Sequence, residues 1–129
     1  MRKLKLLMFS FSILILCSNL VLAKTHTDFS QEDYDRVLNG EKNMIGAHLD
    51  RACFRGMNLR GVDFSEAELD VADFENADLT GANFTKADLE DANLKGAKID
   101  GAFFKGAELE FATWVNGRVC GEGSIGGCW

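Results

Sequence analysis

Histidine is scarce in this sequence, and no catalytic arrangement built on histidine can be found. The chain of 129 residues has only two histidines, His26 and His48, and it offers no convincing Ser–His–Asp arrangement for nucleophilic catalysis. His48 and Cys53 make at best a weak metal-binding pair, and two ordinary surface residues explain them more simply. We therefore expect a protein that is not an enzyme and that holds no cofactor and no resident metal.

The N-terminal residues 1–23 have the features of a secretory signal peptide. Three basic residues stand near the start, an apolar run follows, and Val21 and Ala23 give the small-x-small pattern that signal peptidase recognises. An uncleaved membrane anchor is the alternative, because the run approaches the length that spans a bilayer. Polar residues interrupt the run, so cleavage is favoured, and the mature protein is expected to be periplasmic or secreted.

Basic residues are outnumbered, and cleavage would widen the difference. The signal carries three of the 14 basic residues and none of the 20 acidic ones, so the mature chain would have a net charge of −9. Phosphates would repel such a chain, which disfavours nucleic acid and anionic membrane surfaces as partners. A basic protein or a divalent cation is compatible with the charge, and solubility alone also explains it.

Residues 42–116 divide into fifteen units of five residues without insertion or deletion. The first residue is alanine in twelve units, and the third residue is apolar in all of them. The period fits neither a helix, which repeats every 3.6 residues, nor a strand, which repeats every two. Each unit is therefore expected to make the same short step and then to turn.

Units such as ADLTG, ANFTK and ANLKG resemble the A-[DN]-[LF]-x-x repeat of the pentapeptide repeat family. The resemblance implies an all-β fold, a right-handed quadrilateral parallel β-helix in which four units make one square coil. Fifteen units would then make about four coils, stacked about 4.8 Å apart as neighbouring strands are.

Steps of twenty residues sort the third residues by type, which supports four units per coil. Aromatic residues gather on two opposed faces and aliphatic residues on the other two, and a narrow core favours this alternation because four phenylalanines in one layer would overfill it. The aromatic faces carry Met44, Phe64, Phe84 and Phe104, and opposite them Phe54, Phe74, Leu94 and Trp114.

Both ends of such a stack need covering, because a solenoid exposes core and unpaired backbone at its ends. Residues 24–41 are predicted to hold a short capping helix, with Ser30 as its N-cap, a staple between Phe29 and Tyr34, and Gly40 at its exit. Tyr34 is expected to lie on the first coil.

Residues 117–129 are predicted to close the other end. Gly121, Gly123 and Gly126 match the G-x-G-x-x-G pattern of a dinucleotide loop, but only three residues follow Gly126, so no helix can follow it. Cys120 and Cys128 bracket this segment, and an oxidising compartment would favour a disulfide between them. Similar tails in small exported members of the family agree with this.

This tail is expected to fold back over the open end of the stack. An apolar patch is predicted beneath it, formed by Phe103, Phe111, Trp114, Val119 and Trp129. The role of Cys53 stays open.

One face of the predicted coil is lined by acidic residues. The residues that flank Leu49, Leu69, Leu89 and Leu109 project outward in two columns, and seven of them are carboxylates. The candidate binding residues are Asp50, Glu68, Asp70, Asp88, Glu90, Glu108 and Glu110. A basic protein or a divalent cation would suit this face, while a solvated acidic surface is the simpler interpretation. A glycosidase also uses paired carboxylates, but it needs a cleft that a convex wall does not offer.

The resemblance implies binding rather than catalysis. We expect an exported binding or scaffold module whose partner the sequence does not identify. The alternative is a DNA-mimicking protein that binds a topoisomerase such as gyrase, as the best-known members of the family do. An export signal argues against that alternative, because an exported protein does not meet gyrase.

Overall fold

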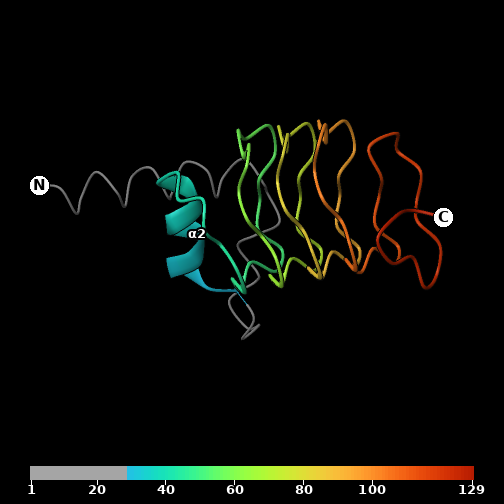
Figure 1. The fold of residues 1–129 in the computed structure, drawn as a ribbon, viewed down its shortest axis with the longest axis horizontal. Helices are drawn as coiled ribbons and strands as arrows, with labels where there is room; N and C mark the ends of the chain where they lie inside the picture. The colour runs from blue at the N-terminus through green and yellow to red at the C-terminus, as the bar shows by residue number, and fades with distance from the viewer. Residues whose placement is uncertain (1–28) are drawn as a thin grey trace, which may run out of the picture.

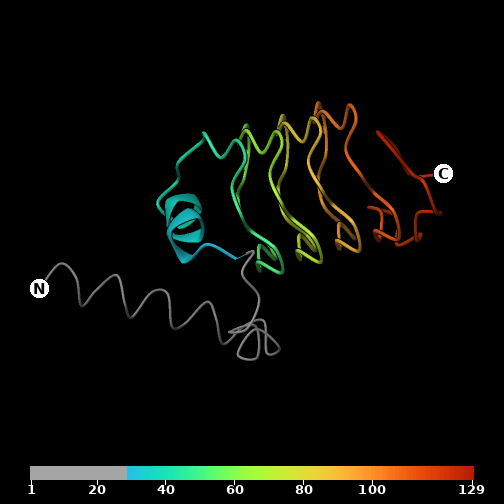
Figure 2. The same ribbon diagram turned by 90° about the horizontal axis from the view of Figure 1, so that it is seen from below.

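The computed structural model describes residues 29–129, so the predicted signal at residues 1–23 lies outside the described part. Figure 1 shows a stack of coils with helix α2 (Gln31–Leu38) at one end and the C-terminal residues at the other. The view turned by 90° shows the same order (Figure 2). Within the described part, no helix is long and apolar enough to cross a membrane.

Residues twenty apart in the sequence lie side by side in the stack. Parallel bridges join the second residue of each unit to the second residue of the unit four places later, as between Asp63 and Asn83 and between Asp73 and Asn93. One coil therefore contains four units, and the predicted quadrilateral β-helix is the fold of the repeats.

The coils contain less strand than an all-β description implies. Each bridge is isolated, and α2 is the one regular element among residues 29–129. Each side of the square has room for a few extended residues before the chain turns at a corner. Backbone hydrogen bonds therefore join one coil to the next at a single residue on each side. The extended stretch on a side is too short to form a regular strand.

Backbone hydrogen bonds tie every side of a coil to both neighbouring coils. Asp63 donates its N–H to the Lys42 carbonyl of the preceding coil, and Phe64 donates to the Asn83 carbonyl of the following one, both at 2.7 Å. The Ala67 N–H bonds to the Phe64 carbonyl at 3.1 Å and closes the turn to the next side. The same bonds recur from unit to unit, so most backbone groups inside the stack are satisfied.

The side chain of the second residue points outward, but in most units it also accepts a hydrogen bond from the backbone. Asn83 accepts a hydrogen bond from the Thr85 N–H at 3.1 Å, and Asp88 accepts one from the Glu90 N–H at 3.0 Å. The amide of the fourth residue has no backbone partner in these units, so a short side-chain oxygen two residues earlier satisfies it. This bond explains why aspartate and asparagine recur in the second place.

The interior is filled by the third residues and by the alanines. Every third residue from Met44 to Leu94 is at most 1% exposed, and the alanines between them are buried too. Burial of each large side chain is worth about 1.5–3 kcal/mol, much of it offset by the entropy of ordering the chain. The last coil is less closed, since Ile99, Phe104 and Trp114 are only partly buried.

Phenylalanine rings stack along the axis as the sequence predicted. The Phe64 and Phe84 rings lie 5.4 Å apart at an interplanar angle of 14°, and the Phe84 and Phe104 rings lie 5.2 Å apart at 9°. Across the coil, Phe74 meets Phe84 edge-on at 5.7 Å and 84°. Aromatic pairs favour both the offset-stacked and the edge-on arrangement, so the two opposed faces fill the core together.

Helix α2 covers the first coil. Tyr34 is 1% exposed, its ring lies 5.5 Å from the Phe54 ring, and its hydroxyl donates to the Cys53 carbonyl at 2.7 Å. The Phe29 ring lies 5.7 Å from the Tyr34 ring, which is the contact expected of a staple. Burial raises the pKa of Tyr34 to about 12.

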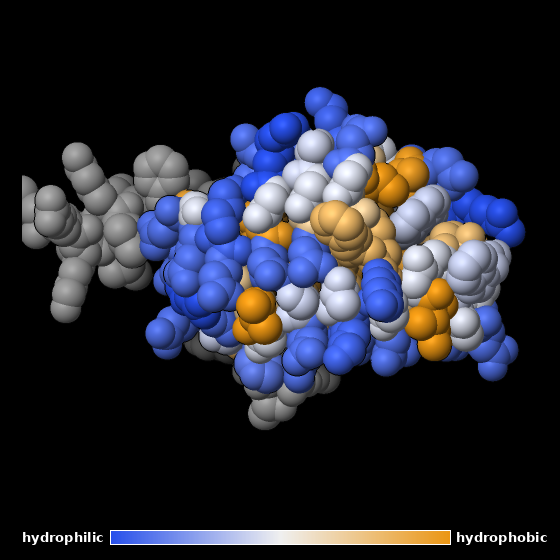
Figure 3. Space-filling view, viewed as in Figure 1, coloured by the Kyte–Doolittle hydropathy of each residue, from blue (hydrophilic) through white to orange (hydrophobic). Residues whose placement is uncertain are grey.

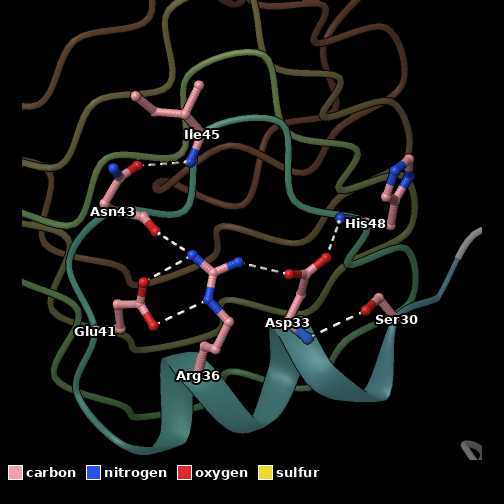
Figure 4. A network of polar contacts seen from close by, with 7 residues as sticks. All are labelled: Ser30, Asp33, Arg36, Glu41, Asn43, Ile45 and His48. Atoms are coloured by element: carbon pink, nitrogen blue, oxygen red, sulfur yellow. Dashed lines mark hydrogen bonds and ion pairs between the residues drawn. The ribbon is translucent and has the colours of Figure 1, made fainter.

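A polar network holds the helix in place on the stack (Figure 4). Ser30 accepts the Asp33 N–H at 3.1 Å as the helix N-cap, and Asp33 in turn accepts the His48 N–H at 3.1 Å. Arg36 joins Asp33 at 2.8 Å and Glu41 at 2.7 Å. The helix is therefore tied to the first coil by its own polar side chains as well as by Tyr34.

Residues 117–129 turn back and run antiparallel to the last coil. Glu108 and Ile125 form an antiparallel bridge, and the Leu109 N–H bonds to the Ser124 carbonyl at 2.8 Å. The tail thus supplies a partner that a further coil would otherwise have supplied.

The predicted disulfide is present. Cys120 and Cys128 are bonded across a sequence separation of 8, with their Cα atoms 4.8 Å apart. The bond closes the tail into a loop, and Cys120 is buried against the core.

The expectation that the tail covers an apolar patch is wrong. Four of its five predicted members are exposed: Phe103 by 62%, Phe111 by 50%, Val119 by 58% and Trp129 by 67%. The fifth, Trp114, is partly buried and packs against the core. The tail is held near the backbone edge of the last coil by hydrogen bonds, so it does not spread over the outward side chains. Figure 3 shows separate apolar groups among hydrophilic side chains on the face that it draws.

The fifth residue of every unit from Gly46 to Phe111 has a positive φ, because the corner requires a left-handed conformation. Val71 has a φ of 58°, which a β-branched side chain rarely adopts, and its side chain is 43% exposed. Gly81 has a φ of 69° at the opposite corner, two sides of the square further along the chain, and nothing lies within 4 Å of a Cβ added there.

We predict that Val71→Gly increases the free energy of unfolding by roughly 0.5–1 kcal/mol, because it removes left-handed strain and little packing. Gly81→Val is the matched reverse change and is expected to lower stability by at least about 1 kcal/mol. Urea unfolding of both variants measures this, and a destabilised Val71→Gly protein would contradict it.

Loss of the disulfide is expected to lower stability by about 2.5 kcal/mol in the loop-entropy description. Either single variant, Cys120→Ser or Cys128→Ser, breaks the same bond, so each should cost as much as the double variant. Thermal unfolding tests both points, and additive losses in the two single variants would show that the bond is not the cause.

Candidate functional site

The acidic face consists of Asp50, Glu68, Asp70, Asp88, Glu90, Glu108 and Glu110. Bridges join the second residues of four successive coils on this side, from His48 to Glu68, Asp88 and Glu108. The register therefore brings all seven predicted residues onto one side of the stack, with one column on each flank of the buried leucines.

The end of this face next to α2 is partly neutralised. The His48 ring lies 2.6 Å from the Glu68 carboxylate, measured from Nδ1 to Oε2. That hydrogen bond and the charge of Glu68 raise the pKa of His48. The Asp50 carboxylate accepts the Asp70 N–H at 3.0 Å, so it has a backbone partner one coil further along.

Carboxylates crowd together in the middle of the acidic face. Single oxygen atoms of Asp88, Glu90 and Glu108 lie within 4.8 Å of one another. At the far end, Glu110 lies beside the tail and accepts the Gly123 N–H at 3.4 Å. The tail therefore donates a backbone N–H to this end of the acidic face.

The crowding changes the acidity of two groups. Partial burial, together with the charges of Asp88, Glu110, Glu108 and Asp70, raises the pKa of Glu90. Partial burial and the charge of Asp88 also raise the pKa of Asp70. Both groups are therefore less acidic than isolated carboxylates.

Other faces balance their charges. Arg55 lies 2.9 Å from Asp73 and 2.7 Å from Glu75, and Arg60 lies 3.4 Å from Asp78. Among residues 29–129, by contrast, none of the ion pairs includes Asp70, Asp88, Glu90, Glu108 or Glu110. The charge of Arg51 acts on Asp70, but carboxylates outnumber cations on the acidic face, which therefore keeps a net negative charge.

This arrangement suits binding rather than chemistry. Its oxygen atoms are hard ligands that a divalent cation or the ammonium and guanidinium groups of a protein could meet. His48 faces outward and is bonded to Glu68, so it is not placed as the base of a nucleophile. Two features of the face are not evident from the sequence: the bond of Asp88 to the Glu90 N–H, and the contact of Glu110 with the tail.

We predict that Glu90→Gln raises stability at pH 7 by a few tenths of a kcal/mol, because stacked like charges repel and solvent screens much of the effect. A carboxyl whose folded pKa is raised costs stability above that pKa, so the gain should disappear as the pH falls below about 4, where Glu90 is protonated in both states.

Glu75→Gln is the matched control, because Glu75 occupies the same place in its unit but is paired with Arg55. That variant should not gain stability at pH 7. Thermal unfolding at pH 3.5 and pH 7, in low and high salt, measures both, and a gain for Glu90→Gln that salt does not reduce would rule out the charge explanation.

Comparison with known proteins gives one family match and several solved structures. The family described as pentapeptide repeat region matches residues 38–104. No curated protein matches the chain. HetL from the cyanobacterium Nostoc sp. strain PCC 7120, a pentapeptide repeat protein involved in heterocyst differentiation regulation, is 25% identical with a TM-score of 0.42. That alignment covers 60% of this chain and 46% of HetL, so the chain spans less than half of HetL.

Two other solved structures are similar. A second pentapeptide repeat protein from Nostoc PCC 7120 is 24% identical over 67% of this chain and 75% of its own, with a TM-score of 0.28. A pentapeptide repeat protein of the Arabidopsis thaliana thylakoid lumen is 32% identical over 55% of this chain and 63% of its own, with a TM-score of 0.23. The family match spans just over half of the chain and includes the acidic-face residues from Asp50 to Glu90. The protein is therefore a member of the pentapeptide repeat family.

Proposed function

We propose that the protein is an exported, non-enzymatic binding or scaffold module that recognises a basic protein through its acidic face. The observation that carries the proposal is the column of carboxylates on one side of four coils, of which Asp70, Asp88, Glu90, Glu108 and Glu110 take part in no ion pair among residues 29–129. Pentapeptide repeat proteins are generally non-enzymatic structural or binding proteins, which agrees with this.

The rigidity of the wall supports recognition by charge. Glu68 and Asp88 are both bridged to the coils before and after them, so the backbone positions of their charges are fixed before a partner arrives. Preorganised charges lose little conformational entropy on binding. Complementary charge also steers association, with a strong dependence on ionic strength.

Export rests on the N-terminal sequence. Residues 1–23 carry the basic start, the apolar run and the cleavage pattern of a signal peptide. Export would place the acidic face in the periplasm or outside the cell, where its partner would also have to be.

A divalent cation is the other ligand that suits these oxygens, and Asp88, Glu90 and Glu108 are the residues that would meet it. A basic protein is favoured because the carboxylates extend over the whole face, whereas a single cation would use only its middle. A calcium titration separates the two, since a specific site would raise the melting temperature at low calcium concentration.

We predict that the parent protein binds a ten-residue lysine peptide and that the triple variant Glu68→Gln, Glu90→Gln, Glu110→Gln binds it at least about tenfold more weakly. The matched control, Glu32→Gln, Glu66→Gln, Asp100→Asn, removes the same charge from other surfaces and should keep most of the affinity. Equal losses in the two triple variants would show that net charge, and not the face, attracts the peptide.

A DNA-mimicking protein that binds gyrase is the second candidate, favoured by the same column of like charges. A mimic should inhibit DNA supercoiling by purified gyrase, and the triple acidic-face variant should lose that inhibition. The absence of inhibition by the parent protein would exclude this candidate and leave the first unaffected.

A further inference from the structure

The tail covers only part of the edge of the last coil. The open edge, residues 97–106, has no coil after it. Among the described residues, the N–H groups of Ile99 and Phe104 donate to nothing, and the carbonyls of Ala97 and Ala102 accept nothing. In every earlier coil these same positions are paired with the next coil.

The pairing of the tail with the last coil shows which kind of backbone segment can bind to such an edge. Beside the open edge, the Leu109 N–H donates to the Ser124 carbonyl and the Ala107 carbonyl accepts the Gly126 N–H, both at 2.8 Å. The partner segment runs antiparallel to the coil: Ile125 lies opposite Glu108, and its two neighbours, Ser124 and Gly126, make the hydrogen bonds. The open edge presents the same donor and acceptor twice more, around Lys98 and around Phe103.

The residues at which the tail pairs with the last coil indicate how far apart the pairing residues of a bound peptide strand would be. Val119 pairs with Thr113 and Ile125 pairs with Glu108, so six residues of an antiparallel partner span one side and one corner of the coil. A segment that continued in the same direction would face Phe103 first and Lys98 six residues later.

The side chains beside the open edge point to the chemistry of that segment. Phe103 is 62% exposed in a place where most units have a polar residue, and no hydrogen bond reaches the Lys105 N–H that an asparagine at 103 would satisfy. Residues that break a local rule of the repeat without a packing gain are expected at functional or strained sites. Lys98 is exposed and takes part in no ion pair within the described residues.

We propose that the open edge binds an extended segment of a partner protein as an added antiparallel strand, with an apolar residue facing Phe103 and an acidic residue facing Lys98. The hydrogen bonds of Ile99 and Phe104 with this strand supply affinity, and the two side-chain pairs supply selectivity. This surface requires a negative charge on its ligand, so it is separate from the acidic face and does not depend on the function proposed for that face.

The probe is the peptide RVSGEGSEG, which copies residues 118–126 with serine at Cys120 and glutamate at Ile125. Its valine would face Phe103 and its glutamate would face Lys98. Titration of the ¹⁵N-labelled protein should shift the amide signals of Ile99 and Phe104 and slow their hydrogen exchange. A peptide with lysine in place of the second glutamate should bind roughly twofold to fivefold more weakly, the effect of one cross-strand charge pair.

Two protein variants make the test specific. Lys98→Glu should reverse the preference, so that the lysine peptide binds it more tightly than the glutamate peptide does. Phe103→Asn should weaken binding up to about fivefold. The same change should leave stability unchanged or raise it, because asparagine is an ordinary residue of the repeat at this position. A merely structural role for Phe103 would lower stability instead.

Three results would overturn the proposal. Shifts confined to Leu109 and Trp114 would mean that the peptide displaces the tail and ignores the open edge. An unchanged preference in Lys98→Glu would exclude the charge pair. A protein that elutes as a dimer, that Phe103→Asn converts to a monomer and that does not bind the peptide would show that a second copy covers this edge.

Discussion

The hydrogen bonds between residues twenty apart decide where every side chain of the repeats lies. Because Asp63 bonds to the coil before and Phe64 to the coil after, the backbone of each unit is fixed from both sides. The third residue must then point inward and the second and fourth must point outward, whatever their chemistry. A charge repeated every twenty residues becomes a column, which is how Glu68, Asp88 and Glu108 come to share one face.

The sequence predicts those features that depend on which side chains are apolar. Fifteen apolar third residues predict the coil and its register, and the structure places Phe64 and Phe84 in the predicted ring stack. Ser30 and Tyr34 predict the start of the helix, and the two tail cysteines predict the disulfide. The isolated bridges, by contrast, follow from how few residues fit between two corners, and no single residue type signals that.

The candidate site shows the same division. Its seven members were predicted because register alone places them, but their roles differ in ways that composition does not reveal. Asp88 satisfies a backbone amide, whereas Glu90 is crowded by like charges and has a raised pKa. In the second place of a unit, aspartate reaches the amide two residues later, as Asp88 does, whereas Glu68 and Glu108 make no such bond. Glu68 bonds to His48 instead, so residue type alone does not reveal which carboxylates remain for a partner.

The two ends of the stack differ because each is closed by a different kind of element. Helix α2 covers the first coil with an apolar side and a buried tyrosine, so it needs few backbone bonds to the coil. The tail instead continues the edge pairing in the antiparallel direction, and it pairs with the two sides that carry Glu108 and Thr113. The Cys120–Cys128 disulfide closes the tail into a loop there, and within residues 29–129 the N–H groups of Ile99 and Phe104 have no backbone partner. Because this end is closed by edge pairing, the sides that the tail does not reach keep their backbone groups available to another strand.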